Sequence, residues 1–554
     1  MLKSNFKTKK QPSPFFPKGR QLDTRSLKEI KALLHELPHD REYLIENLHI
    51  IQDQFKQISS NHLAALAEIM KLSMAEVFEV ATFYHHFDIV KEGEKPIPKI
   101  TIRICEGVSC EMAKSKVLFG KLSEVIRKDV RLIYAPCVGA CDKAPVAVVN
   151  KRQIHHANLK KLQNSLSSKD TKPLIPAYKS FDEYHAEGGY KEWAKCLNNY
   201  SKREEVISHI DSSGLRGLGG AGFPTGRKWG FLKDAKKPRI LAINADEGEP
   251  GTFKDRFILD TNPHRMLEGI LITAWAVEAN KAYIYLRDEY HQSREVLLLE
   301  ITKLKNKNLL GDIEIHLRRG AGAYICGEES AMLESIEGKR GLPRNRPPFP
   351  AQSGLFGYPT LINNVETMYW IPEILKNTAS WYKNEGRPHF YSVSGRVKEP
   401  GIKLAPAGVT VNQLINDFSG GMIDGHRLMA FLPGGASGGL LPAEKENLPL
   451  DFGSLDEFGC FIGSSAVVVF SEHDKIGDIC KNLVHFFEDE SCGQCTPCRV
   501  GCEKLSKLIS REIWDTNLIK ELSTAMQDAS ICGLGQAAPN PVLSAIRFFP
   551  EHIK

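Results

Sequence analysis

The chain has 554 residues, which is too many for one hydrophobic core, so we expect three or four domains. Hydrophobic residues make up 42% of the chain and charged residues 25%, as is ordinary for globular proteins. The net charge of +6 is spread along the chain, which argues against nucleic-acid binding. The sequence contains no run of 18 apolar residues, so we expect no membrane-spanning helix.

The N-terminal residues 1–23 are basic and hold three prolines, Pro12, Pro14 and Pro17. They lack the apolar core of a secretory signal, so we expect an arm that is disordered or binds a partner, with an organelle transit peptide as the alternative. The chain has 13 cysteines. An odd number without a secretory signal predicts a reducing cytoplasm, where clustered cysteines bind metals or act in catalysis.

Residues 24–96 are predicted to be helical. Apolar residues recur at three-to-four spacing over residues 41–49 and 63–83, and Ser60 and Ser73 are candidate N-caps. A small α/β domain is expected next, over residues 97–165. Its predicted elements are strands over 99–104, 130–134 and 146–149 and a helix over 114–128.

Serines, prolines and glycines over residues 166–199 predict a linker. A second α/β domain is expected over residues 200–385, a β-rich insert over 386–470 and helices over 471–554. The strands predicted for the second α/β domain cover residues 240–243, 282–285 and 313–317.

The first cysteine group consists of the pairs Cys105/Cys110 and Cys137/Cys141. Two close pairs about 30 residues apart suit a four-thiolate metal site on loops at strand ends. Spacing alone leaves two alternatives, a structural zinc ion and an iron–sulfur cluster.

The second group is Cys492-x2-Cys495-x2-Cys498, with Cys532 further along the chain. This triple spacing with a distant fourth cysteine is typical of a [4Fe–4S] cluster. Cys502 competes for the fourth position, but it follows Cys498 by only four residues, and we favour Cys532. The other cysteines, Cys196, Cys326, Cys460 and Cys480, are predicted to be ordinary core or surface residues.

A glycine-rich loop, Gly217-x-Gly219-x-x-Gly222, matches a dinucleotide fingerprint. The segment before it is predicted to be helical, which disfavours an ordinary Rossmann site and leaves a mobile surface loop as the alternative. Backbone N–H groups in such a loop can bind phosphate, and Arg216, Arg227 and Lys228 add positive charge.

Two further loops follow predicted strands. Asp246, Glu247 and Glu249 come after the strand at 240–243 and suit ribityl or ribose hydroxyls, although an exposed acidic turn would also explain them. Residues 318–330 follow the strand at 313–317, and the acids at the start of the following helix suit its dipole.

Together these segments resemble one family. The chain is similar to the fused small and large flavoprotein subunits of the NADH-oxidising arm of respiratory complex I, a module shared with NAD-linked formate dehydrogenases and NAD-reducing hydrogenases. The resemblance covers nearly everything after residue 21. The segments that carry it are residues 81–84, the cysteines around 105 and 137, and residues 214–229, 244–256, 320–330 and 490–498.

The resemblance implies a multidomain α/β fold. It implies a helical segment with a thioredoxin-like [2Fe–2S] domain, a Rossmann-like FMN/NAD domain, a ubiquitin-like β-grasp insert and a C-terminal helical bundle with a [4Fe–4S] cluster. It thereby favours [2Fe–2S] over zinc at Cys105, Cys110, Cys137 and Cys141.

The resemblance also implies ligands for FMN and NAD. The FMN residues are Gly217, Gly219, Gly220, Gly222, Lys228, Asn244, Asp246, Glu247, Gly327, Glu328, Asn363 and Asn364. Arg216, Tyr324 and Arg346 are further cofactor-binding residues, Arg346 at a position where relatives often carry lysine. Phe223, Phe231 and Phe349 would surround the adenine of NADH. Glu249 and Glu329 would contact the nucleotide near the flavin, as positioning residues, because hydride transfer needs no side-chain acid or base.

Within the family the chain most resembles the β subunit of NAD-dependent, metal-containing formate dehydrogenase, in residues 17–21, 285–290 and 392–401. That resemblance implies a cytoplasmic partner, a catalytic α subunit with a molybdenum or tungsten pterin. Electrons would pass from the Cys492 cluster to FMN and NAD⁺, with the Cys105 cluster off the main path. The alternatives are the diaphorase subunit of a hydrogenase, a fused complex I module and, in another class, a zinc-binding scaffold.

Overall fold

The computed structural model describes residues 20–198 and 200–553. Residues 1–19 of the predicted N-terminal arm lie outside this range. The described chain divides into two compact units. The first runs to Phe83 and includes Phe87–Ile97, and the second holds Tyr84–His86 and everything described from Pro98 onward.

The first unit is built mainly of helices. Its elements are α1 (Thr24–Leu33), α2 (Leu44–Phe55), α3 (Ser60–Met70), α4 (Met74–Phe83) and the short parallel strands β1 (Ile58–Ser59) and β2 (Ile89–Val90). Ser73 caps α4 as predicted, since its Oγ accepts from the Glu76 N–H at 3.2 Å. At α3 the cap is Ser59 and not Ser60, because the backbone is still extended at Ser59 and its side chain accepts from the His62 N–H.

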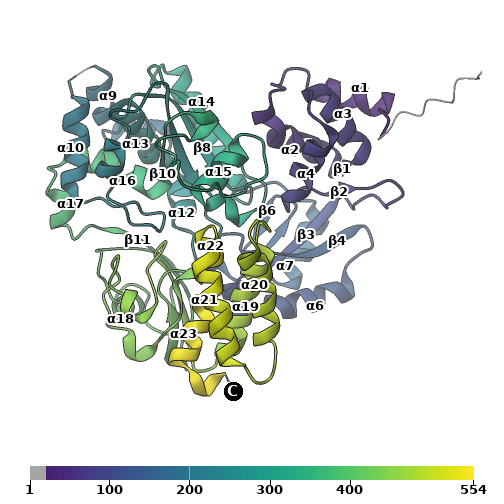
Figure 1. The fold of residues 1–554 in the computed structure, drawn as a ribbon, viewed down its shortest axis with the longest axis vertical. Coiled ribbons are helices and arrows are strands. Elements are labelled where there is room, and N and C mark those ends of the chain that lie inside the picture. The colour runs from purple at the N-terminus through teal and green to yellow at the C-terminus, as the bar shows by residue number, and fades with distance from the viewer. Residues whose placement is uncertain (1–19, 199, 554) are drawn as a thin grey trace, which may run out of the picture. The chain divides into compact units, whose positions relative to one another are not determined.

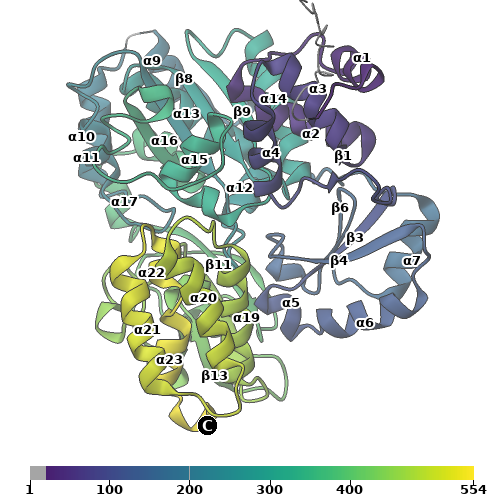
Figure 2. The same cartoon turned by 45° about the vertical axis from the view of Figure 1, so that its right-hand side comes forward.

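The second unit begins with the predicted cysteine-bearing α/β domain, and Figure 2 shows its helices around its sheet. The strands, in the order β4-β3-β5-β6, are β3 (Ile100–Cys105), β4 (Val130–Ala135), β5 (Ala147–Val149) and β6 (Arg152–Ile154). The helices are α5 (Val108–Met112), α6 (Ser115–Val125) and α7 (Leu159–Ser168). Ile102 and Ile104 are buried with Leu118 and Leu122 of α6, so the alternating pattern of β3 buries one face of the strand.

The stretch 166–199, expected to be a linker, is only partly one. It contains α8 (Phe181–Ala186) and α9 (Lys191–Leu197), and Phe181, Tyr184 and Trp193 of these helices are buried in the core of the next domain. The prediction failed here because the glycines and serines of this segment are typical of a linker. The two helices are short and are stabilised by aromatic packing, so they show no long apolar repeat.

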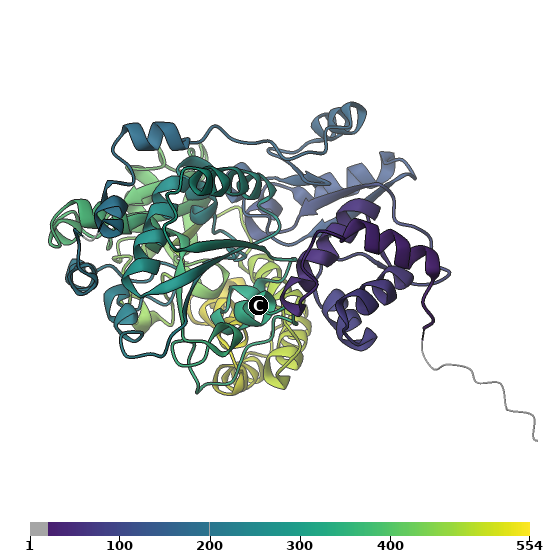
Figure 3. The same cartoon turned by 90° about the horizontal axis from the view of Figure 1, so that it is seen from above.

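A four-stranded parallel sheet organises the next domain, in the order β10-β7-β8-β9. Figure 1 labels β8 and β10 among the helices of this domain, and Figure 3 shows its teal strands from above. Its strands are β7 (Arg239–Ala245), β8 (Ala279–Leu286), β9 (Glu314–Arg319) and β10 (Thr360–Asn364). Its helices are α10 (Arg203–Ser213), α11 (Thr225–Gly230), α12 (Lys254–Thr261), α13 (Pro263–Ala276), α14 (His291–Asn306), α15 (Glu329–Ile336), α16 (Val365–Lys376) and α17 (Trp381–Asn384). Because the strands are parallel, their carboxyl ends meet at one edge, where ligands bind in such sheets.

The β-rich insert is a mixed five-stranded sheet in the order β12-β11-β15-β13-β14. Its elements are β11 (His389–Gly395), β12 (Gly401–Ala405), α18 (Val411–Asn416), β13 (Leu428–Leu432), β14 (Leu441–Pro442) and β15 (Ala466–Ser471). The last strand lies in the middle, parallel to the first, while β12 and β13 run antiparallel to their neighbours. This order, 2-1-5-3-4, is that of the β-grasp, so the ubiquitin-like prediction is confirmed.

The C-terminal helices lie beside the β-grasp sheet, as Figures 1 and 2 both show. They are α19 (Ile476–Asp489), α20 (Thr496–Ile509), α21 (Thr516–Ala529), α22 (Gly533–Ala537) and α23 (Asn540–Phe548). Among the described residues, no helix combines the length and apolar character that crossing a membrane requires.

Candidate functional site: two thiolate sites beside one polar cavity

The first cysteine group comes together at the end of the small sheet. Cys105 ends β3, Cys110 lies in α5, and Cys137 and Cys141 follow β4. All four are buried, and the Sγ atoms of Cys137 and Cys141 lie 3.3 Å apart. Hydrogen bonds from Cys105 and Cys141 lower the pKa of the Cys137 thiol. Four converging thiols, with hydrogen bonds linking Cys110 to Cys105, Cys105 to Cys137 and Cys137 to Cys141, suit a metal–sulfur cluster.

The second group also converges. Cys492, Cys495, Cys498 and Cys532 line one small cavity. Cys495 is the N-cap of α20, at the positive end of the helix dipole. Cys502 is buried within α20 and is not part of the cavity wall; its thiol hydrogen-bonds to Cys498 and lowers the pKa of Cys498 to about 7. The geometry therefore supports Cys532 as the fourth ligand.

The remaining cysteines follow the prediction. Cys196, Cys326, Cys460 and Cys480 are buried, and all 13 cysteines are free of disulfides. Burial raises the pKa of each of these four thiols to about 12, which keeps them inert as nucleophiles.

A cavity of about 400 Å³ lies at the carboxyl end of the parallel sheet, where residues at the ends of β7 and β10 meet the glycine loop, the β-grasp domain and α22. That volume suits a mononucleotide cofactor. The predicted residues that line it are Gly219, Gly220, Asn244, Asp246, Glu247, Glu249, Tyr324, Gly327, Glu328 and Asn364. Residues that the sequence did not indicate also line it, among them Lys254, Asp255, Ser437, Phe461, Ser464 and Leu534.

The glycine loop forms one wall of the cavity. Gly217 donates to the carbonyl of Phe223 at 2.8 Å, and Gly222 donates to that of Gly217 at 3.2 Å, so the loop is a closed turn. A Cβ at Gly222 would lie 2.4 Å from the Phe452 ring, and its φ of +64° is one that glycine adopts freely. The loop is therefore structured, and Gly219 and Gly220 present bare backbone to the cavity.

The strand ends supply the polar groups. The side chain of Asn244 donates to the carbonyl of Gly327 at 2.8 Å, which joins two of the cavity loops. Among the described residues, Asp246 Oδ2 and Asn363 Nδ2 are buried without a hydrogen-bond partner. Buried polar atoms are rarely left unpaired, so Asp246 Oδ2, which belongs to a residue of the cavity wall, points to a polar ligand such as FMN. Asn363 was also predicted to bind FMN, but it is not part of that wall.

The three acids after β7 have different surroundings. Glu247 is buried and accepts from the Asp255 N–H, the Arg256 N–H and the Tyr290 hydroxyl, so it holds the start of α12. Glu249 accepts from the Ser437 N–H at 2.7 Å, and burial raises the pKa of Glu249 to about 7. Burial also raises the pKa of Asp246 well above its usual range.

Several predicted residues lie outside the cavity wall. Glu329 forms ion pairs with Arg346 at 3.0 Å and Lys228 at 3.7 Å, and Arg346 also bonds to Glu328. Glu328 is the N-cap of α15, which occupies one of its carboxylate oxygens. These residues form a charged group beside the cavity.

The aromatic residues predicted for adenine are exposed. Phe223 is 40% exposed, Phe231 56% and Phe349 52%, and the rings of Phe223 and Phe231 are 5.7 Å apart. Arg216, also outside the wall, donates to the carbonyl of Gly222 at 3.3 Å and lies over the Phe452 ring. Exposed aromatic rings next to a polar cavity suit stacking with a base.

The cavity and the second thiolate group share a wall. Ile325 and Leu534 line both the large cavity and the small one around Cys492, Cys495, Cys498 and Cys532. In addition, the carboxylate of Glu490, two residues before Cys492, accepts from the Tyr324 N–H at 2.8 Å. Glu490 was not predicted to have a role, although it closely precedes the cysteine run.

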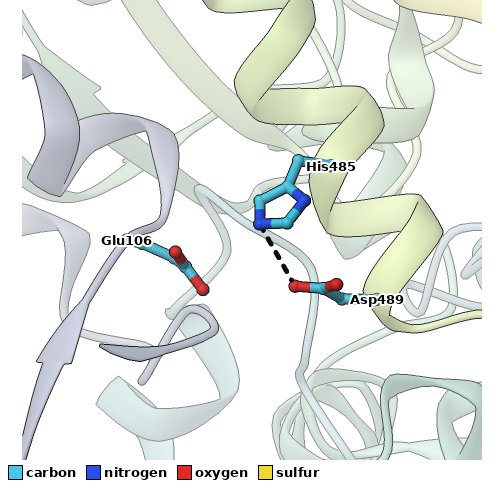
Figure 4. A group of neighbouring side chains, drawn as sticks. All are labelled: Glu106, His485 and Asp489. Atoms are coloured by element: carbon cyan, nitrogen blue, oxygen red, sulfur yellow. Dashed lines mark ion pairs between the residues drawn. The ribbon is translucent and has the colours of Figure 1, made fainter. Parts of the chain in front are cut away.

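A mixed group of side chains lies at the contact between the first thiolate domain and α19. Glu106, which follows Cys105, faces His485 and Asp489, and Figure 4 shows the three side chains pointing toward one another. His485 and Asp489 are exposed and form an ion pair at 3.4 Å. Asn482 of the same helix donates to the Glu106 carbonyl at 2.8 Å, so the group joins the two domains.

The fold and these sites fit an iron–sulfur flavoprotein that reacts with a nicotinamide nucleotide, and comparisons with known proteins give this class. Residues 30–169 match the thioredoxin-like [2Fe–2S] ferredoxin family. Residues 210–373 match the Nuo51 FMN-binding domain, and residues 478–554 match the NADH-ubiquinone oxidoreductase-F iron–sulfur binding region.

Individual relatives agree. The chain is 40% identical to the F subunit of NADH-quinone oxidoreductase from Aquifex aeolicus, over 70% of this chain and 93% of that protein. It is 39% identical to an F subunit of the same enzyme from Rhizobium meliloti, over 68% of this chain and 94% of that protein. A crystal structure of NAD⁺-reducing [NiFe]-hydrogenase in the H2-reduced state matches 93% of this chain and 92% of its own, with 30% identity and a TM-score of 0.81.

The chain belongs to the family of NADH-quinone oxidoreductase F subunits. Its cofactors are FMN, NAD, a [2Fe–2S] cluster and a [4Fe–4S] cluster. The open choice between zinc and iron at the first cysteine group is thereby settled for iron, and the zinc scaffold is excluded.

Proposed function

We propose that this chain is the NAD(H)-reacting subunit of a larger complex and passes electrons between NAD(H) and a partner's redox centre. The observation that carries the proposal is the wall of Ile325 and Leu534 shared by the large cavity and the Cys492 site. When bound, FMN exchanges electron pairs with a nicotinamide and single electrons with an iron–sulfur cluster. A cavity separated from a cluster site by single side chains provides a short path for such electrons.

Around FMN we assign separate roles to the cavity residues. The bare backbone of Gly219 and Gly220 would accommodate the phosphate, since N–H groups of a closed glycine turn bind anions. Asp246, which lines the cavity, would pair its free carboxyl oxygen with the cofactor. Lys254 is held between Asp255 at 2.8 Å and Glu366 at 3.1 Å, so its charge is already balanced within the protein.

For the nucleotide we assign Glu249 and the group of Glu329, Arg346 and Lys228 to positioning. Phe223, Phe231 and Phe349 would stack on the adenine. None of these side chains needs to transfer a proton to the nicotinamide, so their contribution is to bind, orient and exclude water.

We further propose that the partner is the catalytic subunit of a formate dehydrogenase. Three features support it: the fusion of both halves in one chain, all four cysteines of the first group, and the family-like segments 285–290 and 392–401. A second candidate is a hydrogenase, favoured by the match of the hydrogenase chain to 93% of this chain.

The deciding experiment uses the native complex, purified anaerobically, with formate or hydrogen as sole electron donor and NAD⁺ as acceptor. NADH from formate alone supports the formate dehydrogenase proposal, and NADH from hydrogen alone moves the chain to a hydrogenase. If neither donor works while NADH bleaches the flavin, the proposal that this chain reacts with NAD(H) is supported and both partner proposals are wrong. If NADH fails to bleach the flavin, the core proposal itself is wrong.

A further inference from the structure

The end of β8 and the loop after it hold a family-like segment, Tyr285-Leu-Arg-Asp-Glu-Tyr290, for which no role was predicted. Its arginine, Arg287, has a side chain that is 4% exposed. A buried guanidinium is costly unless its N–H groups are paired, so its partners show why it is there.

Those partners belong to two cofactor sites. Arg287 Nη2 donates to the carbonyl oxygen of Cys137 at 2.7 Å, and Nη1 donates to the carbonyl oxygen of Glu247. Cys137 belongs to the first thiolate group, and Glu247 lines the large cavity. One side chain therefore joins the loop of the [2Fe–2S] site to the loop of the FMN site.

The guanidinium is fixed in place. Arg287 Nε donates to Glu289 Oε2 at 3.1 Å, and Nη2 lies 2.9 Å from Glu289 Oε1, a two-point pairing that sets its plane. The guanidinium also lies 5.0 Å from the centre of the Tyr290 ring, and the Tyr290 hydroxyl donates to Glu247 at 2.7 Å.

The cysteine loop packs directly on this arrangement. A Cβ at Gly139, between Cys137 and Cys141, would lie 2.3 Å from the Tyr290 hydroxyl. Only glycine fits here, so the loop of the first cluster lies against the residues that hold Arg287.

Glu289 pairs with Arg287, but it is the guanidinium, and not the carboxylate, that bonds to the cluster loop, at the carbonyl of Cys137. Reduction adds one negative charge to the cluster, and a buried cation stabilises that charge more than a solvent-exposed one does. Charge and hydrogen bonds around the cluster are known determinants of its potential.

We propose that Arg287 is a positioning residue that ties the [2Fe–2S] loop to the flavin loop and raises the reduction potential of the [2Fe–2S] cluster. The proposal rests on the cofactor placement proposed above. It gives the first cluster, which lies off the expected electron path, a defined link to the flavin site.

The test is an EPR-monitored redox titration of the [2Fe–2S] signal in the purified complex. Arg287→Met removes the charge at similar length, Arg287→Lys keeps the charge, and Lys143→Gln removes a half-exposed charge two residues after Cys141 as the control. At the potential where half of the unmodified cluster is reduced, R287M should lower the ratio of reduced to oxidised cluster at least tenfold. That ratio corresponds to a fall of about 59 mV in the reduction potential of this one-electron couple. R287K and K143Q should change that ratio far less.

An unchanged potential in R287M would overturn the proposal, as would a shift in R287K or K143Q equal to that in R287M. If R287M assembles no cluster, R287K decides: a potential close to that of the unmodified complex supports the role of the charge, and a shifted one overturns it. An unmodified complex without any [2Fe–2S] signal would instead contradict the cofactor placement.

Discussion

Cys502 and Cys532 compete, on sequence spacing, to complete the second cluster, and their surroundings separate them. Cys532 lies in the cavity wall with the other three thiols, whereas Cys502 is buried in α20 and hydrogen-bonds to Cys498. We expect C532S to lose the [4Fe–4S] EPR signal and to keep the [2Fe–2S] signal. The matched variant C502S should keep both signals; loss of the [4Fe–4S] signal in C502S alone would reverse the assignment.

Glu249 provides a prediction about pH. Burial raises its pKa to about 7, so the side chain is mostly neutral at pH 6 and mostly ionised at pH 8. NADH carries negative charge, and a carboxylate that ionises in the same cavity repels it. The KM for NADH should therefore rise several-fold from pH 6 to pH 8, and E249Q should flatten this rise. Equal pH profiles of KM in the two proteins would show that Glu249 does not face the nucleotide.

At the scale of elements, helices α13 and α16 cross at Gly269. A Cβ there would lie 1.9 Å from the backbone oxygen of Met368, so Gly269 permits this close packing. We expect G269A to push the helices apart and lower the free energy of unfolding by about 2 kcal/mol, in the range for overpacked cores. Urea titration measures this change. In the control variant G477A, an added Cβ in α19 meets no atom within 4 Å, so its free energy of unfolding should be unchanged or slightly higher.

The elements themselves were largely predictable, because strong periodicity reports one buried face. The alternating residues of β3 form a strand where their pattern predicts one. The helices α8 and α9 were missed because their burial depends on aromatic contacts with a distant sheet.

The site was predictable only in part. The short spacings between cysteines and between glycines are typical of cluster-binding and phosphate-binding loops, so the cluster ligands and the loop at Gly219 could be proposed from sequence. Ser437 and Phe461 reach the cavity from the β-grasp domain, far along the chain from Glu249, and nothing local marks them. Arg287 was likewise visible as a motif, but its two backbone acceptors are created only by the fold.

At the scale of the whole molecule, the two cysteine groups proposed to hold the clusters occupy different positions relative to the cavity. The Cys492 site shares the wall of Ile325 and Leu534 with it, whereas the Cys105 site is joined to it through Arg287. If electrons cross the wall of Ile325 and Leu534, those from the partner reach FMN through the Cys492 cluster. The first cluster then exchanges electrons with the flavin without lying between flavin and partner.

This arrangement predicts different effects of removing each cluster. In the complex, C495A should abolish NAD⁺ reduction by the partner's donor, because the path to FMN is cut. It should leave NADH oxidation by an artificial acceptor that reacts directly with the flavin. C110A should retain most of both activities, since it removes only the [2Fe–2S] site. Iron content and flavin absorbance confirm which cofactor each variant has lost. A loss of partner-driven NAD⁺ reduction in C110A as complete as in C495A would place the first cluster on the main path and contradict the role proposed for the shared wall.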